Sequence, residues 1–279
     1  MNFVTCKLIG PSEIGGIHYF GLANQMFQIA TALSYAKEHD LQCLLPMLND
    51  RRFGSYKNNI FRKLNFDEFN EDEIEVEFTE NEFSYSEITK ANKIRLSGYF
   101  QSEKYFIKNR KLILDTFVPT EEIIKKIKNK YGYLLTDSAS VHLRFGDYLK
   151  IQDHHPIIAK TDYYSKALDL TTKKNILVFS DDIKKAKKMR EFKKRNVTFI
   201  EDNDEVTDLF LMSMCEDNII ANSSFSWWGA WLNTNPTKNV YAPSSWFGPA
   251  KSGYNTKDLI PESWQRIDCF SKKYNFKFF

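Results

Sequence analysis

The segment "SVHLRFGDY", residues 140–148, places a histidine, an arginine and an aspartate close together along the chain. His142 and Arg144 are two residues apart, so their side chains share one face if the segment is a strand. Gly146 permits a sharp turn before Asp147. An arginine stays charged at any relevant pH and can bind a diphosphate through paired hydrogen bonds. The segment therefore predicts an anion site, with a structural ion pair between Arg144 and Asp147 as the alternative.

The segment "ANSSFSWWGAW", residues 221–231, places small polar side chains directly before three tryptophans. We expect a strand that ends at Asn222 and a helix that starts within 224–227. Serine and asparagine at such a turn can cap the free backbone N–H groups of the helix. The same turn can bind a phosphate, because these N–H groups and the positive end of the helix dipole converge there. The tryptophan rings can hold the turn rigid against a sheet in either case.

Two further segments contain pairs of aspartates. Asp181 and Asp182 end another expected strand, where one of them can cap the next helix or accept hydrogen bonds from a purine or ribose. Asp202 and Asp204 form a D-x-D triplet, a pattern that can hold a divalent ion against a diphosphate. Asp204 lies where a helix cap is needed, so we expect capping and no metal site.

The beginning of the chain has the pattern of a strand, a helix and a second strand. Residues 3–9 are rich in β-branched and apolar side chains, and residues 24–38 repeat apolar positions at helical spacing. Residues 41–45 then predict another strand, which completes a βαβ unit. The loop after the first strand contains Gly15, Gly16 and Gly21.

The middle of the chain contains the expected domain boundary. Residues 67–82 are strongly acidic without a clear period, which indicates a surface region or an insertion near an acceptor site. Helices are expected around 103–115 and 120–130, and Gly132 then begins a break. We therefore predict an N-terminal α/β domain over 1–132 and a C-terminal domain over 133–279.

Strands and helices alternate regularly after this break. Strands are expected at 139–144, 175–179, 196–200, 218–221 and 238–242. Helices are expected at 162–170, 182–194 and 205–216. This alternation predicts a parallel sheet with right-handed crossovers, a Rossmann-like half. Ligands bind beyond the carboxyl ends of such strands, which is where the polar segments described above lie.

A basic run at 184–195, "KKAKKMREFKKR", invites a nucleic-acid interpretation. However, Ile183, Ala186, Met189 and Phe192 line one side and leave the lysines outward. A solvated helix face is the better interpretation. The net charge of the whole chain is only +3, so we expect no nucleic-acid partner.

The composition predicts a soluble, cytoplasmic protein. Hydrophobic residues make up 42% of the 279 residues, enough for a core in one large or two small domains. No apolar stretch is long enough for a transmembrane segment, and the first residues lack a signal-peptide pattern. The cysteines are far apart and form no C-x-x-C pair, so we expect free and mostly buried thiols. They are Cys6, Cys43, Cys215 and Cys269.

Three segments together resemble the alpha-1,2-fucosyltransferases, glycosyltransferase family 11. They are "GLANQMFQIATALSYA" (21–36), "VHLRFGDY" (141–148) and "LMSMCEDNIIANSSFSWWGAWLN" (211–233). Two more segments look like further landmarks of that family in the expected order. They are "LSGYFQSEKYF" (96–106) and "VFSDDI" (178–183).

The resemblance implies a GT-B-like α/β fold of two Rossmann-like domains facing a cleft. The domain over 1–132 would lie on the acceptor side, and the domain over 133–279 would bind the GDP-sugar. It implies a fucosyltransferase that moves L-fucose from GDP-fucose to O2 of a galactoside in an oligosaccharide acceptor, with inversion and without a metal or other cofactor. Arg144 would hold the diphosphate, with His142 and Asp147 in the same pocket. Asp181 would face the guanosine, and Asn24 and Gln25 would project into the cleft from the acceptor side. The implied donor-binding residues are Asn24, Asp181, Asn222, Ser223, Ser224, Phe225 and Ser226.

The chain departs from the family pattern at two positions. Phe145 replaces the second arginine of H-x-R-R-G-D, and Ala23 replaces a glycine of G-L-G-N-Q. A transferase with another nucleotide-sugar or a protein acceptor, and a non-catalytic nucleotide-sugar-binding protein, therefore stay open as alternatives. The sequence does not identify the base that would deprotonate the acceptor. The candidates are Asp147, His142, His154 and His155.

Overall fold

The computed structural model describes residues 1–8, 13–14, 17–18, 21–48, 51–67 and 69–269. The chain forms two compact units. The first comprises Met1–Thr120 and Tyr254–Pro261, and the second comprises Glu121–Gly253 and the chain from Glu262 onward. This division differs from the boundary expected at residue 132, because α4 (Glu121–Tyr131) belongs to the second unit. There Lys126 of α4 pairs with Asp204 at 3.3 Å.

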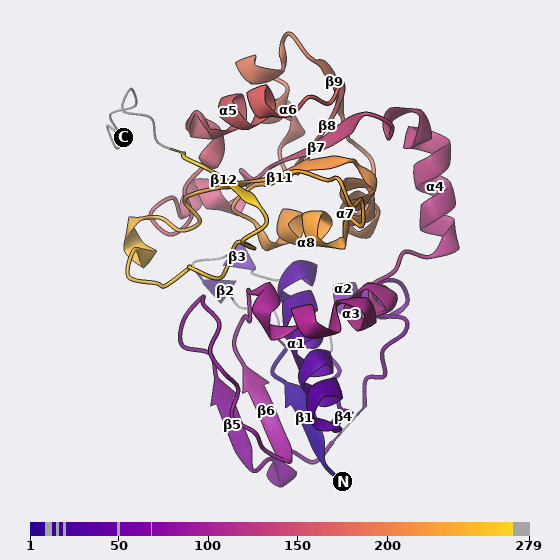
Figure 1. Ribbon diagram of the computed structural model, residues 1–279, viewed down its shortest axis with the longest axis vertical. Coiled ribbons are helices and arrows are strands. Elements are labelled where there is room, and N and C mark those ends of the chain that lie inside the picture. Colours follow the sequence, from indigo (N-terminus) through magenta and orange to yellow (C-terminus); the bar gives the residue numbers. More distant parts are fainter. Residues whose placement is uncertain (9–12, 15–16, 19–20, 49–50, 68, 270–279) are drawn as a thin grey trace. The chain divides into compact units, whose positions relative to one another are not determined.

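The first unit contains a four-stranded parallel sheet in the order β4-β1-β6-β5 (Figure 1). Its strands are β1 (Phe3–Cys6), β4 (Gln42–Cys43), β5 (Val76–Thr79) and β6 (Lys93–Ser97). β1 is buried at every position, as expected for a central parallel strand. α1 (Leu22–His39) connects β1 to β4. The predicted βαβ unit is therefore confirmed, although Gly15 and Gly16 of its loop lie outside the described residues.

The acidic region 67–82 is more than a surface segment, because it contains the edge strand β5. Val76 and Phe78 are half-buried, whereas the residues that alternate with them are exposed. Glu77 lies on the exposed side and contacts Arg95 of β6 at 3.8 Å. The glutamates hide this alternation in the sequence, since an edge strand needs to bury only one side.

The remaining elements of the first unit are short. They are β2 (Glu13–Ile14), β3 (Ile17–His18), α2 (Arg51–Lys57), η1 (Glu71–Glu73), η2 (Glu103–Tyr105), η3 (Ile107–Asn109) and α3 (Arg110–Thr116). The helix expected over 103–115 is thus divided into two 3₁₀ turns and a short α-helix.

The second unit contains a six-stranded, all-parallel sheet in the order β12-β11-β10-β7-β8-β9 (Figure 1). Its strands are β7 (Ser138–Leu143), β8 (Asn175–Ser180), β9 (Asn196–Phe199), β10 (Asp217–Ile219), β11 (Val240–Pro243) and β12 (Gln265–Ile267). Five of them are confirmed predictions, and β12 is an addition. The Rossmann-like alternation of this half is therefore confirmed.

Helices and 3₁₀ turns precede β7 and connect the strands of this sheet. Besides α4, they are η4 (Gly132–Leu134), η5 (Asp147–Lys150), η6 (Ile158–Lys160), α5 (Tyr163–Leu170), α6 (Ile183–Ala186), η7 (Arg190–Phe192), α7 (Glu205–Met214), α8 (Ser224–Leu232) and η8 (Pro249–Lys251).

The helix predicted over 182–194 is wrong in extent. α6 ends at Ala186, and a 3₁₀ turn follows at Arg190–Phe192. The apolar residues of this segment are spaced by three, which suits turns with i→i+3 hydrogen bonds better than an α-helix. Two such bonds run from the N–H of Met189 to Ala186 and from the N–H of Lys193 to Arg190. The apolar side chains still pack on the core, as predicted.

The three tryptophans of α8 form the centre of a buried aromatic cluster. Trp227, Trp228 and Trp231 are at most 1% exposed. The Trp227 ring lies 5.3 Å from Trp228 and 6.3 Å from Trp231. Gly229 lets α8 approach α7, since a Cβ there would lie 3.0 Å from the Cβ of Met212. The rings therefore fix the helix whose first turn follows Asn222, as the sequence predicts.

The cysteine prediction is confirmed for all four positions. Each is a free thiol, and Cys6, Cys215 and Cys269 are buried. Among the described residues, no helix is both long enough and apolar enough to cross a membrane.

Candidate functional site

Three polar segments meet at the carboxyl edge of the second sheet. β7 lies between β10 and β8. Leu143 pairs with Ser180, and Val141 pairs with Ile219. The segments that follow these strands therefore emerge side by side, as the alternation predicted.

Arg144 is the central cation of this edge. Its Nη2 lies 2.6 Å from Asp147 Oδ1, and its Nη1 lies 3.1 Å from Asp181 Oδ2. The guanidinium also lies over the ring of Tyr148 at 5.4 Å. Burial alone would lower the pKa of Arg144, but the carboxylates of Asp181 and Asp147 raise it above its ordinary value. The side chain remains 33% exposed, so a fixed and permanently charged guanidinium is still accessible to a ligand.

Asp181 links the ends of β7 and β8. Its Oδ1 accepts the backbone N–H of Phe145 at 2.9 Å, while its Oδ2 pairs with Arg144. Gly146 is required beside it, because a Cβ there would lie 2.5 Å from Asp181 Oδ2. Asp182 has a different role, since it caps α6 by accepting the N–H of Lys185 at 3.0 Å. The capping alternative therefore holds for Asp182, and the guanosine-facing role of Asp181 stays a prediction.

The two histidines beside Arg144 are neutral and weakly basic. Burial, followed by the charge of Arg144, lowers the pKa of His142 to about 3. Burial, followed by the charge of Lys251, lowers the pKa of His155 to about 3. His142 lies 5.7 Å from the Phe225 ring, and His155 stacks on Tyr148 at 4.6 Å.

The serine turn before α8 is held by its own polar side chains. Asn222 donates to the carbonyls of Pro156 and Trp246 at 3.1 and 3.2 Å. Ser226 Oγ accepts the N–H of Ala221 at 3.2 Å. The amide N–H groups of Asn222 and the hydroxyl of Ser226 therefore support the turn, and the donor-binding roles of these two residues stay predictions.

The N-terminus of α8 carries no side-chain cap. Ser223 stands at the N-cap position, but its hydroxyl makes no capping hydrogen bond. Ser224 and Phe225 follow it and are partly exposed. The capping interpretation is thus wrong for Ser223, and the start of this buried helix remains suited to an anion.

Three buried polar atoms without a hydrogen-bond partner belong to this edge. They are Nδ1 of His142, Nδ1 of His155 and Oδ1 of Asn222. Most buried polar groups in folded proteins are paired, so a group of unpaired ones calls for an explanation such as a bound ligand. Together with Arg144 and the start of α8, they outline a site that suits a polar, anionic ligand.

Asn24 and Gln25 lie in the first unit, at the start of α1. Asn24 Oδ1 accepts a hydrogen bond from Gln101 Nε2 at 2.9 Å. Gln25 is fully buried, and neither atom of its amide group has a partner. Gln25 thus lies in the interior of that unit, whereas Asn24 is partly exposed. Their acceptor-side roles stay predictions.

The D-x-D triplet caps a helix, as predicted. Asp204 accepts the N–H of Thr207 at 2.7 Å at the start of α7. Asp202 has a left-handed backbone with φ of 64°. Within the described residues, no three His, Cys, Asp or Glu side chains are grouped in a way that could hold a metal ion.

The model of glycosyl transferase family 11 matches residues 16–264. This chain belongs to that family. An alpha-1,2-colitosyltransferase of Escherichia coli is 29% identical over 96% of this chain and 100% of its own length. The O-antigen biosynthesis glycosyltransferase WbnK of Escherichia coli is 36% identical over 61% of this chain and 59% of its own length.

The fold of this family 11 chain matches that of a solved fucosyltransferase. The structure of NodZ from Bradyrhizobium gives a TM-score of 0.50 with 14% identity, over 82% of this chain and 91% of that chain. A likeness at this identity shows a shared fold. The predicted α/β, GT-B-like fold class is therefore confirmed.

Phe145, which departs from the family pattern, lies on the same side of the chain as the core residues of β7. Phe145 is 6% exposed and packs in a cluster with Val141, Leu143 and Tyr164. Arg144 contacts the two aspartates instead. The phenylalanine therefore does not occupy the position that faces the candidate ligand site.

Sequence reasoning missed two contributors to the site. Tyr148 lies under Arg144 and donates its hydroxyl proton to the Asn222 carbonyl at 2.9 Å, which ties two of the three segments together. Lys251 lies 3.4 Å from His155 Nε2. Tyr148 directly follows Asp147 in the sequence, and this neighbourhood could have indicated that Tyr148 belongs to the site. Nothing in the sequence places Lys251 there.

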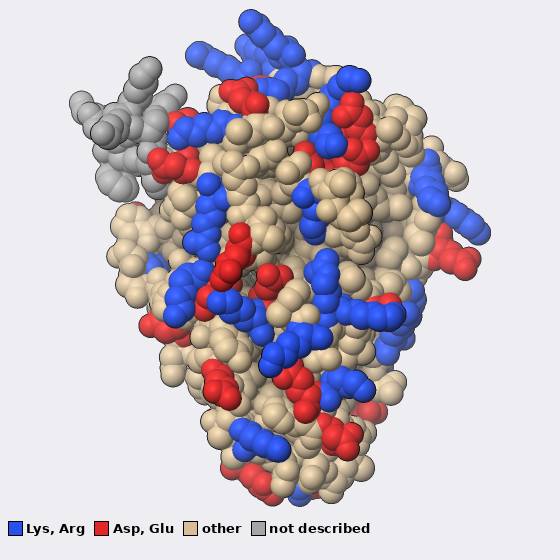
Figure 2. All heavy atoms as spheres, in the orientation of Figure 1, with Lys and Arg blue, Asp and Glu red and all other residues tan. Residues whose placement is uncertain are grey.

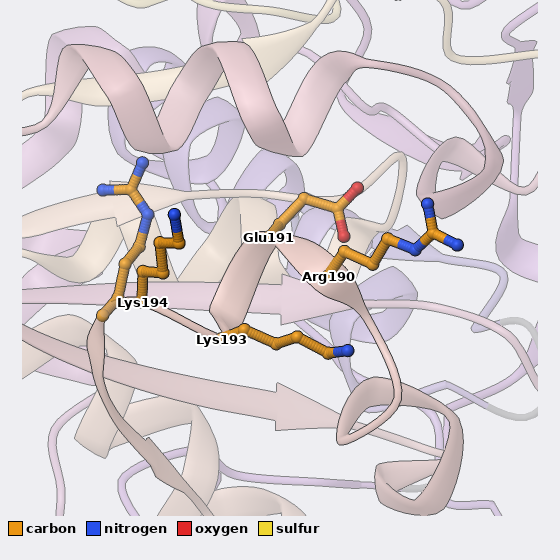
Figure 3. Close-up of a pocket in the computed structure, with 5 residues that line it drawn as sticks. Arg190, Glu191, Lys193 and Lys194 are labelled. Carbon is orange, nitrogen blue, oxygen red and sulfur yellow. The ribbon is translucent and has the colours of Figure 1, made fainter.

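A basic hollow lies away from these residues. It is lined by Arg190, Glu191, Lys193, Lys194 and Arg195. Figure 3 labels the first four, which lie along η7 and the chain that follows it. In Figure 2, lysine and arginine side chains also gather at the end of the second unit that carries α6. None of the predicted site residues lines this hollow, so we do not assign it to the family's chemistry.

Proposed function

We propose that this chain transfers L-fucose from GDP-fucose to a sugar hydroxyl, O2 of a galactoside, with inversion and without a metal ion. Membership of glycosyltransferase family 11 supports a sugar transfer. The observation that carries the donor assignment is the guanidinium of Arg144. It is fixed by Asp147 and Asp181 beside three unpaired buried polar atoms.

Arg144 would act on the departing diphosphate. Arginine has five N–H donors, and its contacts with the two aspartates leave donors and a third of its surface for a ligand. Charge develops on the diphosphate as the bond to the sugar breaks. A fixed guanidinium and the N-terminus of α8 would stabilise that charge more in the transition state than in the ground state.

The acceptor proton would not require a strong base. His142 and His155 have pKa values of about 3, so they are poor proton acceptors at neutral pH. A dissociative transition state makes the sugar carbon strongly electrophilic before the acceptor hydroxyl loses its proton. Asp147 is then the carboxylate that we propose for receiving the proton late in the reaction.

Transfer of colitose is a second candidate. The relative aligned over its whole length is named an alpha-1,2-colitosyltransferase, and colitose is L-fucose without its 3-hydroxyl group. A site that hydrogen-bonds this hydroxyl would reject the deoxy sugar strongly, whereas an apolar site would discriminate only weakly. The choice between fucose and colitose as the donor sugar therefore depends on how the site treats the 3-hydroxyl group.

One experiment tests the proposal and separates its rivals. The purified chain is incubated with GDP-fucose, GDP-colitose, GDP-mannose or UDP-galactose and with lactose as acceptor, and GDP or UDP release and the product linkage are measured. We expect release from GDP-fucose and a new alpha-1,2 linkage on galactose. Release only from another donor supports a related transferase. Saturable GDP-fucose binding without any GDP release, with or without acceptor, identifies a non-catalytic binding protein.

A further inference from the structure

The segment "LSGYFQSEKYF" takes no part in the site described above. In the structure its first two residues end β6, and the rest of the segment follows at the carboxyl edge of the first unit's sheet. This edge is the position where parallel sheets bind ligands.

The loop after β6 is rigidly held. Gln28 donates its amide N–H to the carbonyl of Gly98 at 2.8 Å. Glu80 Oε2 accepts the backbone N–H groups of Tyr99 and Phe100 at 2.8 and 2.6 Å. Phe100 has a left-handed φ of 54°, a conformation that is costly for an aromatic residue and needs such support. Gly98 is required, because a Cβ there would lie 2.5 Å from the Cβ of Glu80.

The side chain that this loop presents is nevertheless exposed. The ring of Tyr99 is stacked on Phe83 at 5.6 Å, and the residue is 37% exposed. Phe83 in turn contacts Tyr254 at 5.3 Å, and Tyr254 is 44% exposed. Tyr99, Phe83 and Tyr254 thus form a continuous aromatic surface, which we call the aromatic platform.

The chain returns from the second unit to complete this platform. Tyr254 begins the segment Tyr254–Pro261, which belongs to the first unit. Asn255 donates its N–H to Glu82 Oε2 at 2.8 Å. Asp258 accepts the N–H of Tyr85 at 3.1 Å and pairs with Lys104 at 2.6 Å. These contacts fix the position of Tyr254 beside the loop that carries Phe83.

The chemistry of this surface suits a sugar ring. A pyranose has a C–H face that can lie on an aromatic ring and a rim of hydroxyl groups that needs polar partners. The platform offers three flat rings, of which those of Tyr99 and Tyr254 carry phenol groups. Glu82 and Asn255 lie at its border. A stable contact with a second copy of the chain would need about 800 Å² from each partner, far more than three rings bordered by polar groups provide.

We propose that the aromatic platform binds a pyranose ring of the acceptor glycan. This inference rests on the proposed function, because it names the place where that function's acceptor binds. A rigid loop with exposed rings loses little conformational freedom when a ligand binds, which explains why so many contacts hold a loop that leaves its tyrosine exposed.

The test uses the full chain and the variants Tyr99→Ala, Tyr254→Ala and Tyr99→Phe. Tyr133→Ala is the matched control, because Tyr133 is 79% exposed in the second unit. Saturation-transfer NMR with lactose, methyl β-galactopyranoside and maltose measures binding, and transfer kinetics measure the acceptor and donor KM separately. We expect the two platform Ala variants to raise the acceptor KM about tenfold. Their donor KM and GDP release without acceptor should stay unchanged, and Tyr99→Phe and Tyr133→Ala should behave like the wild type.

The outcomes separate this inference from the proposed function. If no nucleotide-sugar is turned over but lactose binding is lost in Tyr99→Ala, the transfer proposal fails and the platform stands. If transfer occurs with an unchanged acceptor KM in both platform Ala variants, the platform assignment is wrong. It is also wrong if no saccharide binds to the wild type, or if these variants only convert a dimer to a monomer in sedimentation experiments.

Discussion

Asp181 pairs with the guanidinium of Arg144 at 3.1 Å through one carboxylate oxygen and accepts the N–H of Phe145 at 2.9 Å through the other. Asp147, which follows β7, binds the same guanidinium at 2.6 Å. The arginine is thus oriented by carboxylates from two neighbouring strand ends. Orientation of this kind lowers the entropy lost when a ligand or transition state forms hydrogen bonds with the arginine.

Substitution of Arg144 should abolish most of the activity without unfolding the protein. We expect Arg144→Ala to lower turnover by on the order of 100- to 1,000-fold, because it removes a charged donor that strengthens its contact as GDP departs. Arg144→Lys should recover only part of the loss, since lysine cannot make the same forked contacts. The measurements are turnover with GDP-fucose and the melting temperature. Near-normal turnover in Arg144→Ala would show that another group stabilises the diphosphate.

The two neighbouring aspartates should differ in their effect on catalysis. Asp181→Asn keeps an acceptor for the Phe145 amide but weakens the hold on Arg144, so we expect turnover to fall on the order of tenfold. Asp182→Asn makes the same change in charge one residue away. It should leave turnover at the wild-type level, because asparagine also caps a helix well. Equal effects of the two variants on turnover would contradict the positioning role of Asp181.

Restoration of the family's second arginine should not improve the enzyme. Phe145 is buried in the core cluster, so Phe145→Arg would bury a charge without a partner, at a cost on the order of 3–5 kcal/mol. Phe145→Leu serves as the control and should keep turnover while losing about 1 kcal/mol of stability. Thermal unfolding and turnover are measured for both. A strong gain in turnover from Phe145→Arg would show that this position faces the diphosphate.

Most of the second unit could be predicted because its signals are local. Strands such as Asn175–Ser180 contain short apolar runs, and the rule for parallel sheets then brings the polar ends of the strands to one edge. Alternation along the chain also predicts that Arg144 and Phe145 face opposite sides. The contact between Arg144 and Asp181 is different, since it depends on the register of Leu143 with Ser180, which no local pattern specifies.

The contributions that the sequence did not predict come from the paths of loops and from packing between segments. The Tyr148–His155 stack depends on the path of a loop without regular structure. Tyr254 reaches Phe83 only because the chain crosses back to the first unit near its end. The edge strand Val76–Thr79 was hidden because its exposed side carries glutamate. The partners of Tyr254 and of the edge strand lie far away in the sequence, and composition gives no indication of any of these contacts.

The activity should not depend on a divalent metal ion. Asp204 is used as a helix cap, so Asp204→Ala should lower stability by about 1 kcal/mol through the loss of that cap. Asp202→Asn should change little, because asparagine tolerates a left-handed backbone. Turnover should persist in EDTA and be equal in both variants once the protein is folded. If turnover is lost in EDTA and restored by manganese, Asp202 and Asp204 do hold a metal ion.

The stability of the first unit should decrease as pH rises through neutrality because of Glu80. Burial raises the pKa of Glu80 to about 7 from its ordinary 4.5, although the amide N–H groups of Phe100 and Tyr99 act in the opposite direction. The folded state therefore binds this proton more tightly than the unfolded state. The resulting stabilisation is fully present below pH 4.5 and is lost as pH rises toward 7, at a slope of at most about 1.4 kcal/mol per pH unit.

Glu80→Gln isolates this contribution, because glutamine keeps the acceptor for both amides and does not titrate. The lowered pKa values of His142 and His155 make stability rise with pH, which is opposite to the effect of Glu80. Both histidines are present in the variant and in the wild type, so their contribution cancels in the comparison. We expect the melting temperature of the variant, relative to that of the wild type, to rise steadily between pH 5 and pH 8. The measurement is thermal unfolding at constant ionic strength over this range, with Glu82→Gln as the control for a nearby exposed carboxylate. A difference that does not change with pH would mean that Glu80 is already ionised at pH 5 in the folded protein, held by the two amides that shape the loop of Tyr99.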